Sequence, residues 1–299
     1  MKKFIKHSVL FFVIFFIAEK SAYFISNASE REYDKRLEYV INGKMNKDLI
    51  ILGSSIGASN ILAGQIENET GLTAYNLSYP GSNVLFHEFI LKSLLKFNNS
   101  PKTIILTIDN PSEFIEEKTL KYRSDRLYPL AKYNYINNEL INQNEKNFMS
   151  KLFCLARLNT SVFKFDKIKT PIENPIDSSG SMPFIKKTST IEMEFLEEVK
   201  GYTIKFELKE KLRAFKSIQK LCADNNIQLI FVFSPNYQKF NAAFEKRFQQ
   251  LMLDENKIMV YDTLNPIYKN KDFYYDVSHL MKNGASIFTA EISTFIKTN

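Results

Sequence analysis

Cysteine and histidine are scarce in this sequence of 299 residues, which holds two cysteines and three histidines. The cysteines, Cys154 and Cys222, lie in apolar helix-like settings, with no C-x-x-C pair and no histidine or acidic cluster beside them. We therefore interpret both as small buried apolar side chains rather than as a disulfide or a reactive thiol. This scarcity also argues against a structural metal held by cysteines, and we expect no metal site.

Neither sign of charge dominates the chain. The 40 Lys and Arg residues are interleaved with 33 Asp and Glu residues, and three of the seven net positive charges come from Lys2, Lys3 and Lys6. Because no basic stripe with interleaved aromatic residues occurs, we expect no nucleic-acid partner. With 44% hydrophobic and 24% charged residues, the composition is that of a globular protein. The length suffices for one large α/β domain or two small ones.

A long apolar run occurs at the N-terminus. It follows the three lysines and extends uncharged from Ser8 to Ala18, SVLFFVIFFIA. It fits a cleaved secretory signal, but a helix from Phe4 to Ile25 would be about 33 Å long and would span a bilayer core. We favour an uncleaved anchor over residues 1–26, followed by a charged stalk over 27–47. Both alternatives place the remainder outside the cytoplasm, on the periplasmic side of an inner membrane or at the cell surface.

Beyond residue 47, short aliphatic runs alternate with amphipathic ones. Near-continuous apolar strands separated by helices predict an α/β fold, a doubly wound parallel sheet of about five strands. The expected strands are Leu49 to Leu52, Thr73 to Leu77, Thr103 to Ile108, Gln228 to Phe233 and Ile258 to Tyr261. The expected helices are Gly57 to Asn68, Val84 to Phe97, Phe206 to Asn225, Asn241 to Leu253 and Asn283 to Lys297.

Residues 111–202 interrupt this alternation within the expected domain of residues 48–299. They combine helical segments with a Pro- and Ser-rich loop, TPIENPIDSSGSMPF. An insertion after the third strand would leave from the carboxyl edge of the sheet, where open α/β sheets bind ligands. It is either a cap that contacts substrate or a packing insertion without a ligand role.

Gly53-Ser54-Ser55 directly follows the first expected strand. Such a triplet commonly forms a turn and a helix N-cap. Alternatively, a hydroxyl here stands beside free N–H groups of a helix N-terminus, which would stabilise the anion that acyl transfer generates. A serine nucleophile needs a base, and a histidine is the usual one.

Only one of the three histidines suits that role. His7 lies in the basic segment before the apolar run, and His87 lies on a helix pattern where a structural role is favoured. His279 follows the last expected strand, and Asp276 precedes it by three residues, close enough for a carboxylate to orient the imidazole. In a parallel sheet, the loop after the final strand can reach the loop after the first along the same edge.

These motifs resemble blocks I, II and V of the SGNH/GDSL hydrolase superfamily. The matching residues are Gly53-Ser54-Ser55, the run NLSYPGSN, and Asp276-x-x-His279, over most of residues 48 to 299. With its N-terminal anchor, the chain looks most like the membrane-anchored SGNH-like proteins of bacterial envelopes, which include relatives of the alginate acetylation factors and the teichoic-acid D-alanyl transfer protein.

The resemblance implies that Ser55 is the nucleophile, His279 the base and Asp276 the acid that orients it. It also implies that the backbone N–H groups of Ser55 and Gly81 donate to an oxyanion. Glycine suits that place because it lets the backbone approach a substrate closely.

The sequence departs from the family at block III, where G-x-N-D should follow the third strand and LTIDNPSEF stands instead. Asn110 is therefore either a third oxyanion donor or a turn residue before Pro111. Ser54, Ser234 and Asn236 are candidate substrate contacts, although a Pro-containing turn also explains the last two.

The function that this implies is a serine esterase or O-acyl(acetyl)transferase acting on a cell-envelope glycan through a seryl ester on Ser55. No cofactor is expected, because a triad and backbone donors suffice for ester chemistry. Expected partners are a cell-surface polysaccharide or other acylated glycan, a membrane-bound acyltransferase, and the membrane itself. The alternatives are a non-catalytic glycan-binding or scaffold protein of an envelope complex, and a soluble secreted esterase.

Overall fold

The computed structural model describes residues 1–28, 34–158, 170–188, 192–199 and 201–298. The chain forms two compact units, which we describe separately. One comprises residues 1–33 and 123–169, and the other, here the sheet unit, comprises residues 34–122 and 170–299.

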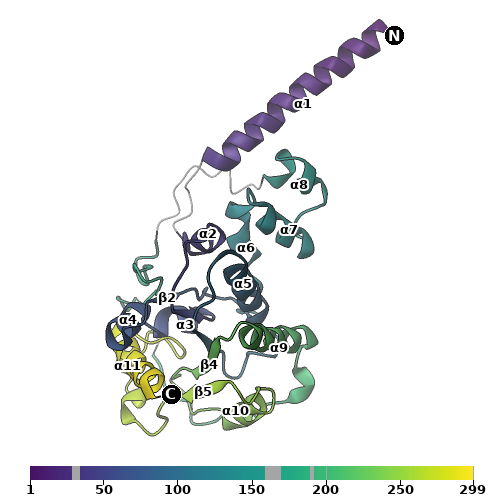
Figure 1. Ribbon diagram of the computed structural model, residues 1–299. Helices are drawn as coiled ribbons and strands as arrows, with labels where there is room; N and C mark the ends of the chain where they lie inside the picture. Colours follow the sequence, from purple (N-terminus) through teal and green to yellow (C-terminus); the bar gives the residue numbers. More distant parts are fainter. Residues whose placement is uncertain (29–33, 159–169, 189–191, 200, 299) are drawn as a thin grey trace. The chain divides into compact units, whose positions relative to one another are not determined.

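The sheet unit is built on five parallel strands in the order β2-β1-β3-β4-β5 (Figure 1). Their bounds are β1 Leu49–Leu52, β2 Ala74–Asn76, β3 Thr103–Ile108, β4 Gln228–Phe233 and β5 Lys257–Val260. The prediction of an α/β fold with a five-stranded parallel sheet is confirmed, with shifts of one residue at each end of β2 and β5. The strand order reverses between β1 and β3, so the crevice outside their carboxyl ends is the place where such sheets bind ligands.

Helices cover both faces of this sheet. On one face, α4 (Ala63–Thr70) and α11 (Lys282–Thr298) pack against a cluster that includes Ile51, Ile105 and Ile230. On the other lie α5 (Val84–Phe97), α9 (Lys209–Asp224) and α10 (Ala242–Gln249). The Phe231 ring lies 5.2 Å from that of Phe215 on α9 and 5.0 Å from that of Phe248 on α10. This burial on both faces explains why the strands are continuously apolar in sequence.

The helix predicted over Gly57 to Asn68 is wrong in one respect, because the structure has two helices there. Helix α3 spans Ser55–Asn60 and α4 begins at Ala63. The break at Ile61 is stabilised from outside the helix: the Asn76 side-chain amide donates to the carbonyl oxygens of Gly57, at 2.8 Å, and Ile61, at 3.1 Å. A distant strand residue thus replaces hydrogen bonds that a continuous helix would make.

The expected stalk also differs from the structure. Residues 34–45 belong to the sheet unit, and its helix α2 (Arg36–Ile41) buries Leu37, Val40 and Ile41. Arg36 is itself buried: it pairs with Asp34 at 2.7 Å and donates to the carbonyl oxygens of Ser78 and Gly180. These bonds tie the segment to the loop after β2.

The expected insertion over 111–202 is divided between the two units. Residues 111–122 and 170–202 lie in the sheet unit, which also contains the 3-10 turns η4 Ile204–Phe206, η5 Pro266–Lys269 and η6 Lys271–Phe273. The other unit contains α6 Ser124–Leu127, η1 Tyr128–Leu130, α7 Asn134–Asn142, α8 Met149–Leu152 and η2 Leu155–Arg157. Residues 123–169 thus group with the N-terminal segment instead of forming one cap with the Pro- and Ser-rich loop.

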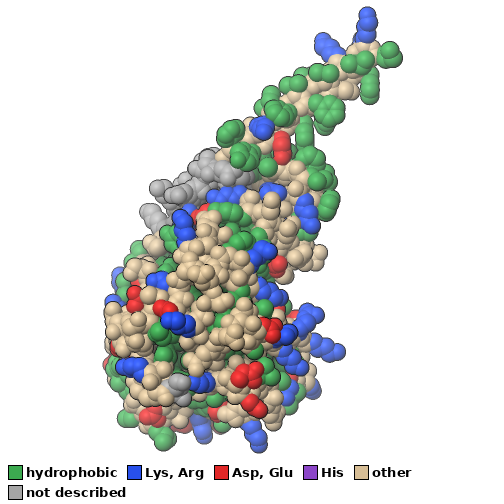
Figure 2. Space-filling model, in the orientation of Figure 1, with side chains coloured by type: hydrophobic (Ala, Val, Ile, Leu, Met, Phe, Trp, Pro, Cys, Tyr) green, Lys and Arg blue, Asp and Glu red, His purple; other side chains and the backbone are tan. Residues whose placement is uncertain are grey.

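The N-terminal helix α1 spans Lys2–Ala28. Its segment Lys2–Ile25, 24 residues, is long and apolar enough to cross a membrane by length and composition. Figure 2 shows apolar side chains along this helix and basic ones at its tip.

The two cysteines differ in environment. Cys222 on α9 is buried, and this burial raises the pKa of its thiol to about 12. Cys154 is only partly buried, so the interpretation of both residues as core side chains is wrong for Cys154. Neither forms a disulfide.

We predict that Arg36→Ala lowers the free energy of unfolding by about 3–5 kcal/mol, because it leaves the Asp34 carboxylate buried without its partner. Urea unfolding of the detergent-solubilised full chain, followed by circular dichroism, measures the loss. The control is Lys102→Ala, which removes an exposed partner of Asp48 and should change stability little. Equal losses in the two variants would contradict the structural role of Arg36.

Candidate active site

The loop between β1 and α3 presents Ser55 at the carboxyl edge of the sheet. Gly53 has a φ of +155°, and a Cβ atom there would lie 1.8 Å from Thr107 Oγ1, so glycine is required. Ser54 caps α3 by accepting from the Ile56 N–H, and Ser55 is the first helical residue. The local sequence therefore forms the N-cap turn and leaves the next hydroxyl, that of Ser55, at a partly exposed position.

Three side chains that are distant in sequence meet here. His279 Nε2 lies 2.7 Å from Ser55 Oγ, and His279 Nδ1 lies 2.8 Å from each carboxylate oxygen of Asp276. Asp276 also accepts from the backbone N–H groups of Ser278 and His279. Ser55, His279 and Asp276 thus form the hydrogen-bonded chain of a Ser-His-Asp triad.

The electrostatics favour the tautomer that this chain needs. Burial raises the pKa of Asp276, but the hydrogen bond from His279 and those from the two backbone N–H groups outweigh it, so the pKa lies below its usual value. An ionised Asp276 holds the proton of His279 on Nδ1. Nε2 is then left as an acceptor for the Ser55 hydroxyl.

Asn60, which the sequence interpretation missed, positions the histidine loop relative to Ser55. It is fully buried at the end of α3. Its Oδ1 accepts from Leu280 N at 2.8 Å, and its Nδ2 donates to Ser278 O at 3.0 Å and to Ser234 Oγ at 2.8 Å. The backbone on both sides of His279 is therefore held by one amide. The only sequence signal was an asparagine at the end of a short run of mostly small residues, SIGASN.

A cavity of about 250 Å³ opens beside the Ser55 hydroxyl. Its lining includes His279, Asp109, Asn110 and Asn236. The side-chain oxygens of Asn110 and Asn236 are buried and have no hydrogen-bond partner among the described residues. Buried polar atoms are rarely left unpaired, so two such amides in one cavity mark a place where a polar ligand would bind.

Two expected site residues lie outside this lining. Ser54 is fully buried and donates to Asp109 at 2.7 Å, so its contacts are structural and it is not among the residues that line the cavity. Gly81 has a φ of +72° in the loop after β2, and it too is absent from the described lining. That loop is bonded to Gly53, whose carbonyl oxygen accepts from Tyr79 N and Ser82 Oγ.

The other residues considered in the sequence analysis lie outside the cavity lining. Ser234 is buried and bonded to Asn60. His87 is buried with Nε2 at 2.9 Å from Ser82 Oγ, and burial lowers its pKa to about 3. His7 lies on α1. Among the described residues, no group of three or more His, Cys, Asp or Glu side chains is placed to hold a metal ion.

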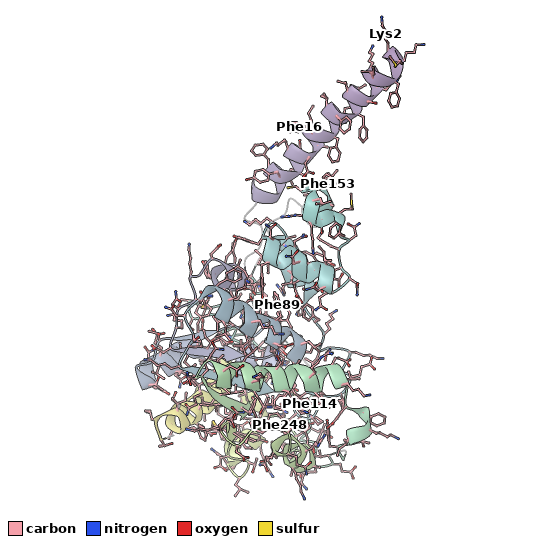
Figure 3. All side chains as sticks on the ribbon, turned by 45° about the vertical axis from the view of Figure 1, so that its right-hand side comes forward. Lys2, Phe16, Phe89, Phe114, Phe153 and Phe248 are labelled. Carbon is pink, nitrogen blue, oxygen red and sulfur yellow. The ribbon has the colours of Figure 1, made fainter. Side chains whose placement is uncertain are left out.

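A pair of buried carboxyl groups adjoins the cavity. Asp109 accepts from Ser54 Oγ, and its backbone N–H donates to Glu113 Oε2 at 3.0 Å. Burial raises the pKa of both acids, and their mutual repulsion adds to the rise for Glu113. The Lys211 ammonium, which donates to Ile115 O at 2.7 Å, offsets part of that repulsion. Phe114, which directly follows Glu113, is buried, and its ring stacks 5.9 Å from that of Phe248 (Figure 3).

No family model matches the chain, and no curated protein matches its sequence.

We predict that Glu113 makes the fold less stable as pH rises. A carboxyl whose pKa is raised by folding binds its proton more tightly in the native state, so stability falls between its ordinary pKa and its raised one. The melting temperature of the protein should therefore decline over that range, and Glu113→Gln should flatten the decline. The exposed Glu116→Gln is the control and should leave the profile unchanged. Parallel profiles for all three proteins would contradict the prediction.

Proposed function

We propose that this protein is a serine esterase or O-acyl(acetyl)transferase of SGNH type that acts on a cell-envelope glycan through a seryl ester on Ser55. The observation that carries the proposal is the 2.7 Å contact between His279 Nε2 and Ser55 Oγ, with Asp276 bonded to the other ring nitrogen. The resemblance of the sequence blocks to the SGNH/GDSL superfamily supports the same chemistry.

In the proposed reaction, Ser55 Oγ attacks the carbonyl carbon of an ester while His279 Nε2 accepts its proton. The ionised Asp276 stabilises the imidazolium. Collapse of the tetrahedral intermediate breaks the bond to the leaving alcohol, which takes the proton from His279. The acyl group then remains on Ser55 until water or a sugar hydroxyl attacks it and releases the serine.

The oxyanion would be stabilised by donors around the Ser55 hydroxyl. We propose the backbone N–H groups of Ser55 and Gly81, and the Asn110 amide as the third donor. Asn110 fits because it lines the cavity beside Ser55 and its side-chain amide carries N–H donors. A single donor of this kind is typically worth about 2.7–4 kcal/mol of transition-state stabilisation.

We propose that α1 anchors the chain in a membrane with the sheet unit on the extracytoplasmic side. The apolar segment Lys2–Ile25 supports an anchor, and the lysines that begin it support the orientation. A glycan at the cell surface is then within reach. A membrane-bound acyltransferase would be the partner that supplies the acyl group if the reaction is a transfer.

We predict that a fluorophosphonate probe labels Ser55, because the probe reacts with serines activated by a histidine. Ser55→Ala should abolish labelling. His279→Ala should lower labelling and p-nitrophenyl acetate hydrolysis by at least about 10³-fold. Labelling is read by mass spectrometry of the modified peptide.

The matched controls are Ser100→Ala and His7→Ala, which exchange the same residue types at exposed positions and should leave both readouts unchanged. If the folded protein neither labels nor hydrolyses the ester, the catalytic proposal fails. The alternative, a non-catalytic glycan-binding or scaffold protein, would then stand.

A further inference from the structure

A second cavity adjoins the one beside Ser55. Its volume is about 290 Å³, and it lies beyond the carboxyl ends of β4 and β5 in the same sheet unit. Asn236 lines both cavities. A molecule in the second cavity would therefore border the cavity that Ser55 lines, at Asn236.

Asn236, the residue shared by the two cavities, carries a hydrogen-bond acceptor that no described residue satisfies. Asn236 is only 8% exposed, and its Oδ1 has no hydrogen-bond partner among the described residues. A buried amide left unpaired is costly, and a ligand with hydroxyl groups would satisfy it from either cavity.

The lining of the second cavity combines aromatic rings with polar and charged groups. Phe195 and Phe240 are partly buried and line it, together with the amide of Gln238. Aromatic rings bury the apolar C–H faces of a sugar ring, and amides pair with its hydroxyls. Lys239 and Lys269 outnumber the single acid in the lining, Glu197, so the cavity favours an anionic ligand.

We propose that this second cavity is the glycan subsite of the enzyme and holds an acidic sugar residue. The inference rests on the function proposed above and specifies its substrate class. A neighbouring sugar in the same chain would place a hydroxyl beside Ser55. In transfer, that hydroxyl oxygen bonds to the acyl carbon, the bond from the acyl carbon to Ser55 Oγ breaks, and the proton passes from the hydroxyl through His279 Nε2 to Ser55.

Binding is measured by saturation-transfer difference NMR with the full-length Ser55→Ala variant, so that no turnover occurs. The probes are tetragalacturonate and tetramannuronate, with maltotetraose as the uncharged comparison. We expect at least one acidic tetramer to bind more tightly than maltotetraose. Lys269→Gln and Phe195→Ala should each weaken that binding about tenfold or more. The exposed Lys271→Gln and Phe206→Ala, outside the cavity, should not.

A second assay separates this inference from the proposed function. The same substitutions are introduced into the protein that retains Ser55, and its hydrolysis of p-nitrophenyl acetate is measured. The small ester needs only the first cavity, so the Lys271→Gln control should hydrolyse it at the rate of the unmodified protein, and Ser55→Ala should not. Normal hydrolysis without binding of either acidic tetramer overturns the subsite, as does equal binding of maltotetraose. Binding that depends on Lys269, without any hydrolysis, overturns the catalytic proposal and supports the cavity as a site for acidic glycans.

A separate observation concerns the unit that contains α1. Four apolar side chains are exposed within residues 148–155: Phe148 at 61%, Met149 at 47%, Leu152 at 61% and Leu155 at 43%. The same segment contacts α1, because the Phe153 ring lies edge-on to Phe15 at 5.3 Å. Figure 3 shows Phe153 beside that helix.

The depth of this contact along α1 is set by Glu19. Its carboxylate accepts from the backbone N–H groups of Cys154 and Leu155, and it directly follows the uncharged run Ser8–Ala18. The exposed apolar side chains therefore lie at the level where the apolar part of α1 ends. The basic Lys151 belongs to the same segment, as is typical of interfacial segments.

We infer that residues 148–155 insert into the lipid interface beside α1, so that the protein contacts the membrane through two elements. This inference depends on α1 spanning the bilayer and not on the catalytic proposal. Lipid is the occupant that the position favours, because the segment continues the apolar surface of the candidate membrane helix.

Because the chain contains no tryptophan, a single introduced tryptophan reports one position without background. In vesicles of phospholipids with brominated acyl chains, Leu152→Trp in the full chain should be quenched and its emission blue-shifted. Phe12→Trp on α1 is the positive control, and Leu264→Trp, at a position 89% exposed in the sheet unit, is the negative one.

If Leu152→Trp is quenched no more than Leu264→Trp while Phe12→Trp is quenched, the interfacial segment is overturned. The apolar surface would then belong to a protein partner. If Phe12→Trp is not quenched, the membrane helix itself is overturned, and the inference fails with it. Phe148→Trp repeats the measurement at a second position and guards against misfolding of one variant.

Discussion

The candidate site depends on one buried amide. Ser55 and His279 are separated by 224 residues, and the parallel sheet brings their loops only to the same edge. Asn60 sets the remaining distance, since it bonds to the backbone on both sides of His279 from a helix that begins at Ser55. A hydrogen bond between catalytic groups needs placement within a fraction of an ångström, and a buried amide with satisfied partners provides that rigidity.

The carboxyl groups around the site have pKa values shifted in opposite directions by their environments. Asp276 accepts from three N–H groups, two of the backbone and one of the imidazole ring, and keeps a lowered pKa, so it remains ionised beside the imidazole. Asp109 and Glu113 are buried next to each other, which raises the pKa of both. This separation matters for the proposed acyl transfer, because a second full negative charge beside the cavity would oppose the anion that such a reaction forms. A proton held by the buried pair reduces that opposition.

Local sequence patterns were enough to predict the strands of the sheet. They failed for segments whose structure depends on hydrogen bonds to polar groups far along the chain. The aliphatic runs of β1, β3 and β4 were identified because burial on both faces leaves no polar alternation. The stalk was misassigned because the charges of Arg36 look solvated until carbonyl groups far along the chain enclose them. Likewise, nothing near Ser54 in sequence reveals that Asp109 buries its hydroxyl. Ser55, His279 and Asp276 could be selected because so few histidines compete for the role, whereas Asn60 carried no comparable constraint.

The segment LTIDNPSEF lacks the glycine of the G-x-N-D pattern, yet Asn110 still lines the cavity beside Ser55. In the register of the sheet, Ile108 of β3 pairs with Phe233 of β4, so Asn110 and Asn236 follow two paired strand ends by two and three residues. Both amides consequently line one cavity and share its unsatisfied polar character. Asn110 lines the cavity beside Ser55 and is absent from the lining of the second cavity, whereas Asn236 borders both. The edge of the sheet thereby supplies two amides to the cavity beside Ser55, and the different roles proposed for them follow from the cavities that each one borders.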